Sequence, residues 1–189
     1  MDKVQAAIEL AVKWHAGQYR KEHNTAGYKI PFIVHPIQVM KVVFNWGVGT
    51  DDNLAAAATH DILEDTDISE GELLDTIGEK SFLIVQELTF HEQAEDPTAK
   101  PEQKHKYLQS FATKSVNALV IKLADRACNV QDFINGGDGA YGAKYARKAQ
   151  PLYEAVMART TEIENMYGQS TAHRMVGVVQ ELLITALRA

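Results

Sequence analysis

Residues 51–66 read DDNLAAAATHDILEDT, and this stretch does most to decide the fold class. Its apolar residues recur at the three- and four-residue spacing of an amphipathic helix, and Asp51 has the side chain and position of a helix cap. The pattern therefore predicts one helix that begins near Asp51 and continues through His60–Asp65. The small side chains of residues 55–58 let neighbouring helices approach closely.

The same periodicity extends along the rest of the chain, and no segment shows a convincing alternating strand pattern. Ser69 and Glu72 have the spacing of a capping box, and turn residues mark loops at 22–31, 92–100 and 136–139. Further helices are predicted at 80–88, 101–112, 116–134, 141–167 and 172–187. We predict an all-α bundle of about eight to ten helices, a single domain over residues 1–189 in which 168–189 is an accessory helix.

The composition indicates a globular protein and argues against several other classes of protein. The 189 residues are 46% hydrophobic and 23% charged, as in an ordinary globular protein, and the net charge of −6 argues against a general nucleic-acid binder. The single cysteine, Cys128, excludes a disulfide framework and a cysteine-only zinc site. No apolar run reaches the length of a membrane span, and the first residues lack a signal-peptide pattern. We expect a cytoplasmic protein that binds neither nucleic acid nor membrane.

The segment His60–Asp65 places four ionisable side chains on one edge of its predicted helix. His60 precedes Glu64 by four residues, and Asp61 precedes Asp65 by four, so each pair shares a face. The apolar neighbours indicate partial burial, where uncompensated carboxylates are costly and a cation would offset that cost. The alternative is an acidic helix end whose carboxylates simply face water.

Two residues elsewhere are candidates to complete a metal site. His35 follows an apolar stretch and precedes Pro36, which we expect to open a helix as its first residue. Asp125 lies in a strongly apolar helical segment and needs a partner there. The alternatives are a hydrogen-bonded core histidine for His35 and an ion pair with a lysine or arginine for Asp125.

Taken together, these residues offer two imidazole nitrogens and two carboxylates from His35, His60, Asp61 and Asp125. This mixed set suits Mn²⁺, Fe²⁺, Co²⁺ or Zn²⁺ better than Mg²⁺ or Ca²⁺, which prefer oxygen alone. The remaining carboxylates, Glu64 and Asp65, would lie one turn beyond, close enough to orient or deprotonate a water molecule. This division of roles is that of a hydrolase.

These residues and their neighbours resemble the HD metal-dependent phosphohydrolases. The resemblance rests on His35, the run His60–Thr66, and the sequence KLADR at 122–126 followed by Asn129. With Tyr19-Arg20-Lys21 before a turn-rich loop, the chain looks like the hydrolase domain of the RelA/SpoT alarmone enzymes from about residue 3 to about residue 160. Its length is similar to that of the stand-alone small alarmone hydrolases, a group that includes the metazoan SpoT homologue.

The resemblance implies an HD-domain fold and manganese-dependent removal of pyrophosphate from the 3′ position of (p)ppGpp, the alarmone of the stringent response, leaving GDP or GTP. It implies metal ligation by His35, His60, Asp61 and Asp125 and activation of water by Glu64 and Asp65. It implies nucleotide contacts by Arg20, Lys21 and Asn129, and Lys122, on the same helix face as Asp125, is expected to point toward the cleft.

Some positions depart from the family pattern. Cys128 stands where the family often has histidine, and we interpret it as a small buried hydrophobe. The segment Phe90–Lys100 lacks the usual lysine-containing pattern, which puts phosphate recognition in question. Lys144, Arg147 and Lys148 form a cationic patch, for which a solvated helix face ranks ahead of a phosphate contact.

Other functions remain open at this point. The same site could act on (p)ppApp or another nucleotide phosphoester, because HD folds serve many substrates. A nucleotide sensor with a silent site is a further alternative. The helix at 168–189 either packs on the core or mediates association into a homo-oligomer.

Overall fold

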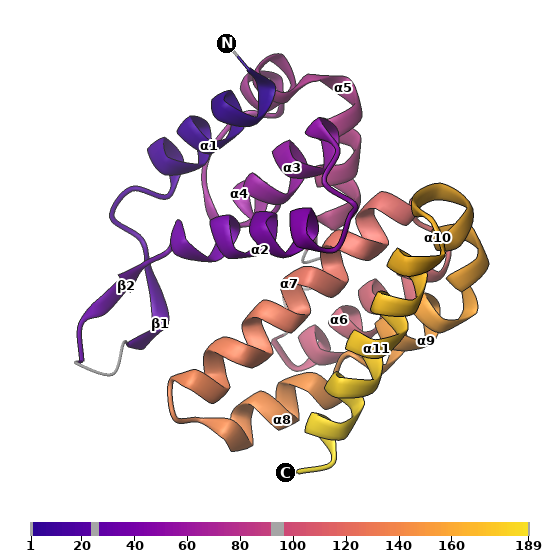
Figure 1. Ribbon diagram of the computed structural model, residues 1–189. Helices are drawn as coiled ribbons and strands as arrows, with labels where there is room; N and C mark the ends of the chain where they lie inside the picture. Colours follow the sequence, from indigo (N-terminus) through magenta and orange to yellow (C-terminus); the bar gives the residue numbers. More distant parts are fainter. Residues whose placement is uncertain (1, 24–26, 92–96, 189) are drawn as a thin grey trace.

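The computed structural model describes residues 2–23, 27–91 and 97–188. In these ranges the chain is mainly helical (Figure 1), which confirms the predicted all-α class. The helices are α1 (Lys3–Trp14), α2 (Val34–Asn45), α3 (Asp51–Ala58), α4 (Ile62–Asp65), α5 (Glu70–Leu88), α6 (Lys100–Gln109), α7 (Val116–Asn135), α8 (Gly139–Arg147), α9 (Gln150–Ala158), α10 (Thr160–Tyr167) and α11 (Gln169–Ala186), with 3₁₀ turns η1 (Pro97–Ala99) and η2 (Ser110–Ala112).

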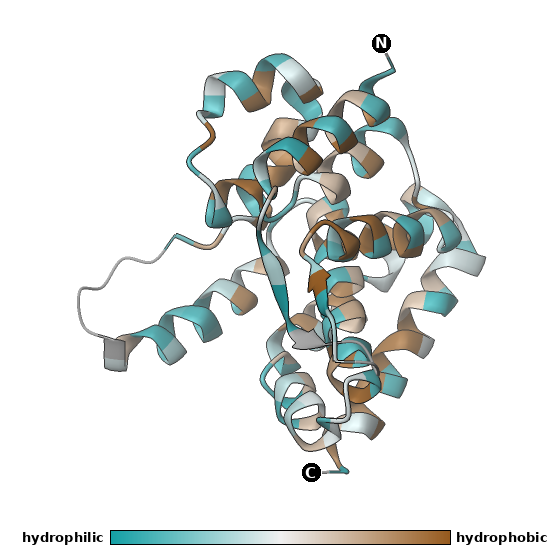
Figure 2. Ribbon diagram, turned by 90° about the vertical axis from the view of Figure 1, so that its left-hand side faces the viewer, coloured by the Kyte–Doolittle hydropathy of each residue, from teal (hydrophilic) through white to brown (hydrophobic). Residues whose placement is uncertain are grey.

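Helix α7 runs through the middle of the molecule, with α1 to α5 on one side and α8 to α11 on the other (Figure 1). On the first side α3 packs against α1, α2 and α5, and α7 packs against α2 and α8. Residues 55–58 are fully buried alanines, so small side chains do line the close helix contacts. Hydrophobic and hydrophilic residues both occur along many of the helices (Figure 2). No helix among the described residues is long and apolar enough to cross a membrane.

A small hairpin corrects the expectation that the chain has no strands. Strands β1 (Tyr19–His23) and β2 (Lys29–Pro31) pair antiparallel, with Tyr19 opposite Pro31, in part of the segment predicted as a loop. Strands of five and three residues are too short to show a convincing alternation of apolar and polar residues. The expectation for residues 24–26 lies outside the described residues, as does that for residues 92–96 of the acidic segment.

The helix predicted to run from residue 51 through residue 65 is interrupted. It ends at Ala58, and α4 begins only at Ile62. At this end the hydroxyl of Thr59 donates to the carbonyl of Ala55, and the N–H of Thr59 turns to Ala56, three residues back instead of four. Residues 59–61 therefore leave the helical path, and His60 does not lie one turn below Glu64 on a continuous helix.

The predicted caps are partly correct. Thr50, and not Asp51, caps α3, because its hydroxyl accepts from the backbone N–H of Asn53 and Asp51 is the first helical residue. Ser69 caps α5 as predicted, accepting from the N–H of Glu72.

The helix predicted at 141–167 is three helices, α8, α9 and α10. Pro151 has no N–H to donate to the preceding turn, so it lies in the first turn of α9 and a new helix starts there. Pro36 is likewise not the first residue of α2 but the third. Gly168, with φ of +89°, ends α10, and α11 then packs against α8, α9 and α10.

Candidate active site

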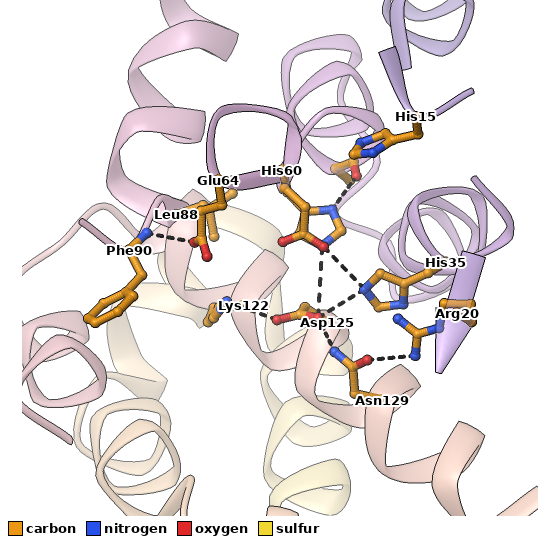
Figure 3. A network of polar contacts seen from close by, with 12 residues as sticks. His15, Arg20, His35, His60, Glu64, Leu88, Phe90, Lys122, Asp125 and Asn129 are labelled. Atoms are coloured by element: carbon orange, nitrogen blue, oxygen red, sulfur yellow. Dashed lines mark hydrogen bonds and ion pairs between the residues drawn. The ribbon is translucent and has the colours of Figure 1, made fainter. Parts of the chain in front are cut away.

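His60 and Asp61 lie in the break between α3 and α4, and Figure 3 shows His60 directed toward Asp125 of α7. The Nδ1 of His60 lies 2.8 Å from the carbonyl of Ala57, so Nδ1 carries the proton and donates it to that oxygen. The opposite nitrogen, Nε2, lies 3.0 Å from Oδ2 of Asp61. Among the described residues, buried Nε2 makes no hydrogen bond of good geometry, although it faces the carboxylates of Asp61 and Asp125.

Helix α2 supplies His35 from its first turn. His35 is 1% exposed, and its Nε2 lies 3.1 Å from Oδ1 of Asp125 and 3.7 Å from Oδ2 of Asp61. One ligand atom from each of His35, His60 and Asp61 lies within 4.8 Å of the others. The folded chain thus brings together residues that are separated by 25 positions in the sequence.

Helix α7 supplies Asp125, the fourth predicted ligand. It is 3% exposed, and its Oδ1 lies 3.8 Å from Nε2 of His60 in addition to its contact with His35. Its Oδ2 pairs with the ammonium of Lys122 at 2.9 Å, and the side-chain amide of Asn129 donates to Oδ1 (Figure 3). Positions 122, 125 and 129 are three and four residues apart, so they share one face of the helix.

Charges in this cluster strongly affect one another. Burial lowers the pKa of His60, but the carboxylates of Asp61 and Asp125 outweigh burial and raise that pKa to about 10. Burial opposes ionisation of both carboxylates as well, yet the pKa of Asp61 is lowered to about 2, chiefly by His60, and Lys122 holds the pKa of Asp125 well below its usual range. The pocket therefore favours positive charge between the two carboxylates.

The residues present fit a divalent cation. Two imidazole Nε2 atoms and two carboxylates converge, and the buried Nε2 of His60, which makes no hydrogen bond of good geometry among the described residues, faces them from a ring held by a backbone hydrogen bond. A hydrogen bond at the other ring nitrogen is the usual way in which a ligating histidine is oriented. A mixed nitrogen and oxygen donor set is typical of sites for first-row transition metals.

Glu64 and Asp65 lie on the short helix directly after the cluster. Oε1 of Glu64 accepts from the N–H of Phe90 at 2.6 Å, which orients the carboxylate. Both side chains remain open to solvent at the cleft, but loss of hydration there raises the pKa of each carboxyl. Carboxylates with raised pKa beside a metal site are suited to accept a proton.

A cleft of about 400 Å³ runs past the cluster, and it is lined by every predicted site residue except buried His60. Arg20 of β1 donates to Oδ1 of Asn129 at 2.8 Å and pairs with Asp132 at 3.2 Å, which ties the hairpin to α7. Lys21 is exposed and lines the same cleft.

Sequence reasoning missed His15 and Gln18. Nδ1 of buried His15 lies 2.8 Å from Oε1 of Gln18, whose side-chain amide donates to the carbonyl of Asp65 at 2.8 Å. The pair supports the turn that carries Asp65. The spacing of metal ligands gave no signal for His15. This histidine contacts Gln18, which binds the backbone of α4, and does not contact the cluster.

Other candidates lie away from the cleft. Lys144 and Arg147 of α8 are exposed, as is Lys148 directly after it, and Arg147 donates to the carbonyl of Ala186. Cys128 is buried, and burial raises the pKa of its thiol to about 12, consistent with a hydrophobe and not with a nucleophile.

Comparisons with known proteins agree with this geometry. The HD domain family model matches residues 7–178. A probable guanosine-3′,5′-bis(diphosphate) 3′-pyrophosphohydrolase of Mycoplasma pneumoniae is 30% identical over 135 residues, 67% of this chain but only 18% of that protein. The guanosine-3′,5′-bis(diphosphate) 3′-pyrophosphohydrolase MESH1 of Drosophila melanogaster is 30% identical over 131 residues, 69% of each chain.

A solved structure of a metazoan orthologue of SpoT that hydrolyses ppGpp has the same fold, with a TM-score of 0.73 at 21% identity. The superposition covers 97% of this chain and 95% of that one. The family model spans nearly the whole chain, and the fold and the His-Asp cluster agree with it. The chain therefore belongs to the HD-domain family, as the motifs in its sequence predict.

Proposed function

We propose that this protein is a metal-dependent (p)ppGpp 3′-pyrophosphohydrolase, which cleaves guanosine 3′,5′-bis(diphosphate) to GDP and pyrophosphate. The observation that carries the proposal is the position of Glu64 and Asp65, at the same cleft as the His35, His60, Asp61 and Asp125 cluster. Relatives that are 30% identical to this chain over the aligned residues carry this activity in their names.

The residues divide the chemistry among them. When bound by the cluster, a divalent cation supplies a Lewis acid that polarises a phosphate oxygen and a nearby water. Glu64 and Asp65 accept the proton of the attacking water, whose oxygen bonds to the phosphorus attached at the 3′ position. The bond from that phosphorus to the 3′ oxygen breaks, the oxygen takes up a proton, and pyrophosphate leaves.

The nucleotide side of the cleft is formed by β1 and α7. Arg20, Lys21 and Asn129 would contact the nucleoside, and Lys122 would neutralise a phosphate oxygen near Asp125. Arg20 already lies 6.0 Å from the ring of Phe32, so its planar guanidinium has an aromatic neighbour at the mouth of the cleft.

The proposal includes Mn²⁺ as the metal, since imidazole and carboxylate ligands suit it. It also includes a cytoplasmic location, no nucleic-acid partner, and a single domain in which residues 168–189 form an accessory helix available for self-association.

Product analysis tests the proposal directly. The manganese-loaded protein is incubated with guanosine tetraphosphate, and the nucleotides are separated by anion exchange beside a Glu64→Ala, Asp65→Ala double variant. We expect GDP and pyrophosphate from the intact protein alone. An unchanged substrate would reject the proposal, and parallel incubations with adenosine alarmones and simple nucleotides would then separate another phosphohydrolase from a silent sensor.

A further inference from the structure

Among the residues that the structure describes, buried Arg126 has no counter-ion. Its residue is 7% exposed and lines the cleft, and its Nε is buried without a hydrogen-bond partner. In the described part of the chain, the one specific contact of its guanidinium is with the ring of Tyr145, whose centroid lies 3.9 Å from Cζ. A buried guanidinium normally requires an anion, because burial without one is costly.

Neighbouring acids do not supply that anion. Asp125 pairs with Lys122 and the histidines, Asp132 pairs with Arg20, and Glu64 accepts from the N–H of Phe90. Lys104, at the mouth of the same cleft, adds positive charge, and burial and nearby cations including Arg126 lower its pKa. This side of the cleft therefore has an excess of positive charge beside unpaired guanidinium donors.

Helix α8 holds Arg126 in place. Tyr145 lies over the guanidinium and packs edge-on against Phe133, with ring centroids 5.4 Å apart. Close approach of α8 to α7 makes this possible, since a Cβ at Gly142 would lie 3.3 Å from the carbonyl of Val130. Stacking on a ring leaves the edge of a guanidinium free to donate hydrogen bonds.

The side chain of Arg126 points away from the metal cluster. Asp125 and Arg126 are adjacent on α7, so their side chains leave the helix about 100° apart. Asp125 faces α2 and His60, whereas Arg126 faces α8. A phosphate at Arg126 is thus not the one that reacts at the cluster.

We propose that Arg126, held on the ring of Tyr145, binds the 5′-diphosphate of the substrate and makes this chain selective for nucleotides with phosphates at both the 3′ and the 5′ positions. The inference rests on the proposed function for the 3′ end. The segment Phe90–Lys100 lacks the lysine-containing pattern that is usual in the family. Arg126 would supply a cation for binding a phosphate in its place.

Hydrolysis with two substrates tests the selectivity. We compare kcat/KM for guanosine tetraphosphate and for guanosine 3′-diphosphate, which lacks the 5′ phosphates. Arg126→Gln should lower kcat/KM about 10- to 100-fold for the first substrate and leave the second nearly unchanged, the size expected for hydrogen bonds to a charged group. An equal loss on both substrates, or no loss, would overturn the proposal.

Equilibrium binding separates this inference from the proposed function. Binding of GDP and guanosine, and of ADP and adenosine, is measured by calorimetry in the absence of turnover. The intact protein should prefer a nucleoside diphosphate to its nucleoside, and Arg126→Gln should remove that preference even if no alarmone is hydrolysed. If the intact protein shows no such preference, or the variant keeps it, the proposal is wrong.

Stability distinguishes a binding role from a structural one. Without ligand, Arg126→Met should leave the melting temperature unchanged or raise it by about 2–4 °C, because an unpaired buried charge is removed. A structural arginine would show a fall instead. Lys144→Gln removes an exposed cation of α8 outside the cleft and is the matched control, with no expected effect on selectivity.

Discussion

Where α2 and the break between α3 and α4 face Asp125 of α7, the buried histidines and Lys122 lie beside carboxylates, whereas toward α8 the guanidinium of Arg126 faces only a ring among the described residues. The first side holds its geometry through contacts within the chain, from the backbone bond at His60 to the Lys122–Asp125 pair. Among the described residues, none supplies an anion to Arg126 on the second side. With the proposed function, the first side serves catalysis and the second serves recognition, and substitutions should affect the two sides differently.

The largest expected effect comes from Asp125→Ala on the first side of the cleft, where the buried charges are paired. The substitution removes a predicted metal ligand and leaves buried Lys122 without its partner, which costs about 3–5 kcal/mol of stability. Turnover should fall by on the order of 10³-fold or more. Metal content and thermal unfolding would be measured together, and Asp125→Asn keeps the shape as a control. Full activity with bound metal would show that Asp125 is not a ligand.

Glu64→Gln should reduce kcat by about 10²- to 10⁴-fold, the range for loss of a general base, while the metal stays bound. The amide keeps the size of the side chain and its acceptor for the N–H of Phe90. Steady-state kinetics and metal analysis of the same sample check this. A loss of metal in parallel with activity would instead place Glu64 among the ligands.

The pH dependence sharpens the role of Glu64. Burial raises its pKa above the ordinary value of 4.5, so the carboxylate takes up a proton at a higher pH than a solvated glutamate does. As the pH falls, kcat/KM should therefore begin to drop before pH 4.5 is reached, with a limiting slope of about tenfold per unit. A profile of kcat/KM in Glu64→Gln should lack this limb; the same limb in the variant would assign it to another group.

A smaller loss of activity is expected from a change at Gln18, which does not belong to the cluster but binds the backbone of Asp65. Gln18→Ala removes the hydrogen bond to the carbonyl of Asp65 and leaves His15 without its partner. Because Gln18 acts by positioning, kcat should fall by about tenfold with KM and metal content nearly unchanged. Gln5→Ala, which loses only an exposed bond to Glu9, is the control. A rise in KM alone would contradict a positioning role.

The smallest effect is expected at Cys128, which belongs to neither charged side of the cleft. Its thiol is buried and its pKa is raised to about 12, so alkylation at neutral pH should be slow in the folded protein. Cys128→Ala should change kcat/KM by less than about twofold and stability by about 1 kcal/mol. Rapid labelling that accompanies inactivation would show that the thiol is accessible and important.

Sequence periodicity was sufficient for the helical class and for the cap at Ser69, because both depend on local spacing. It failed at Thr59, where α3 has ended although the residue pattern predicts that the helix continues. The motifs predicted that four residues lie close together, and the folded chain brings them together: His35, His60, Asp61 and Asp125. Their roles in catalysis stay predictions.

Arg126 and Gln18 could not be found in this way, because their significance depends on partners far away in the sequence. The unpaired state of Arg126 is visible only when the neighbouring acids are seen to be engaged elsewhere. Gln18 donates to the carbonyl of Asp65, and the sequence does not indicate that these two residues lie close together. Both depend on tertiary contacts and not on periodicity.

The continuous course of α7 has a consequence for how the protein can change by insertion and deletion. One added residue between Asp125 and Asn129 would turn Asn129 by about 100° and shift it by about 1.5 Å, separating it from Arg20 and Asp125. Substitutions in this helix alter single contacts, but a change in its length disrupts every contact downstream. Length variation among natural relatives should therefore be absent from α7 and accumulate in connections such as the turn at 136–139.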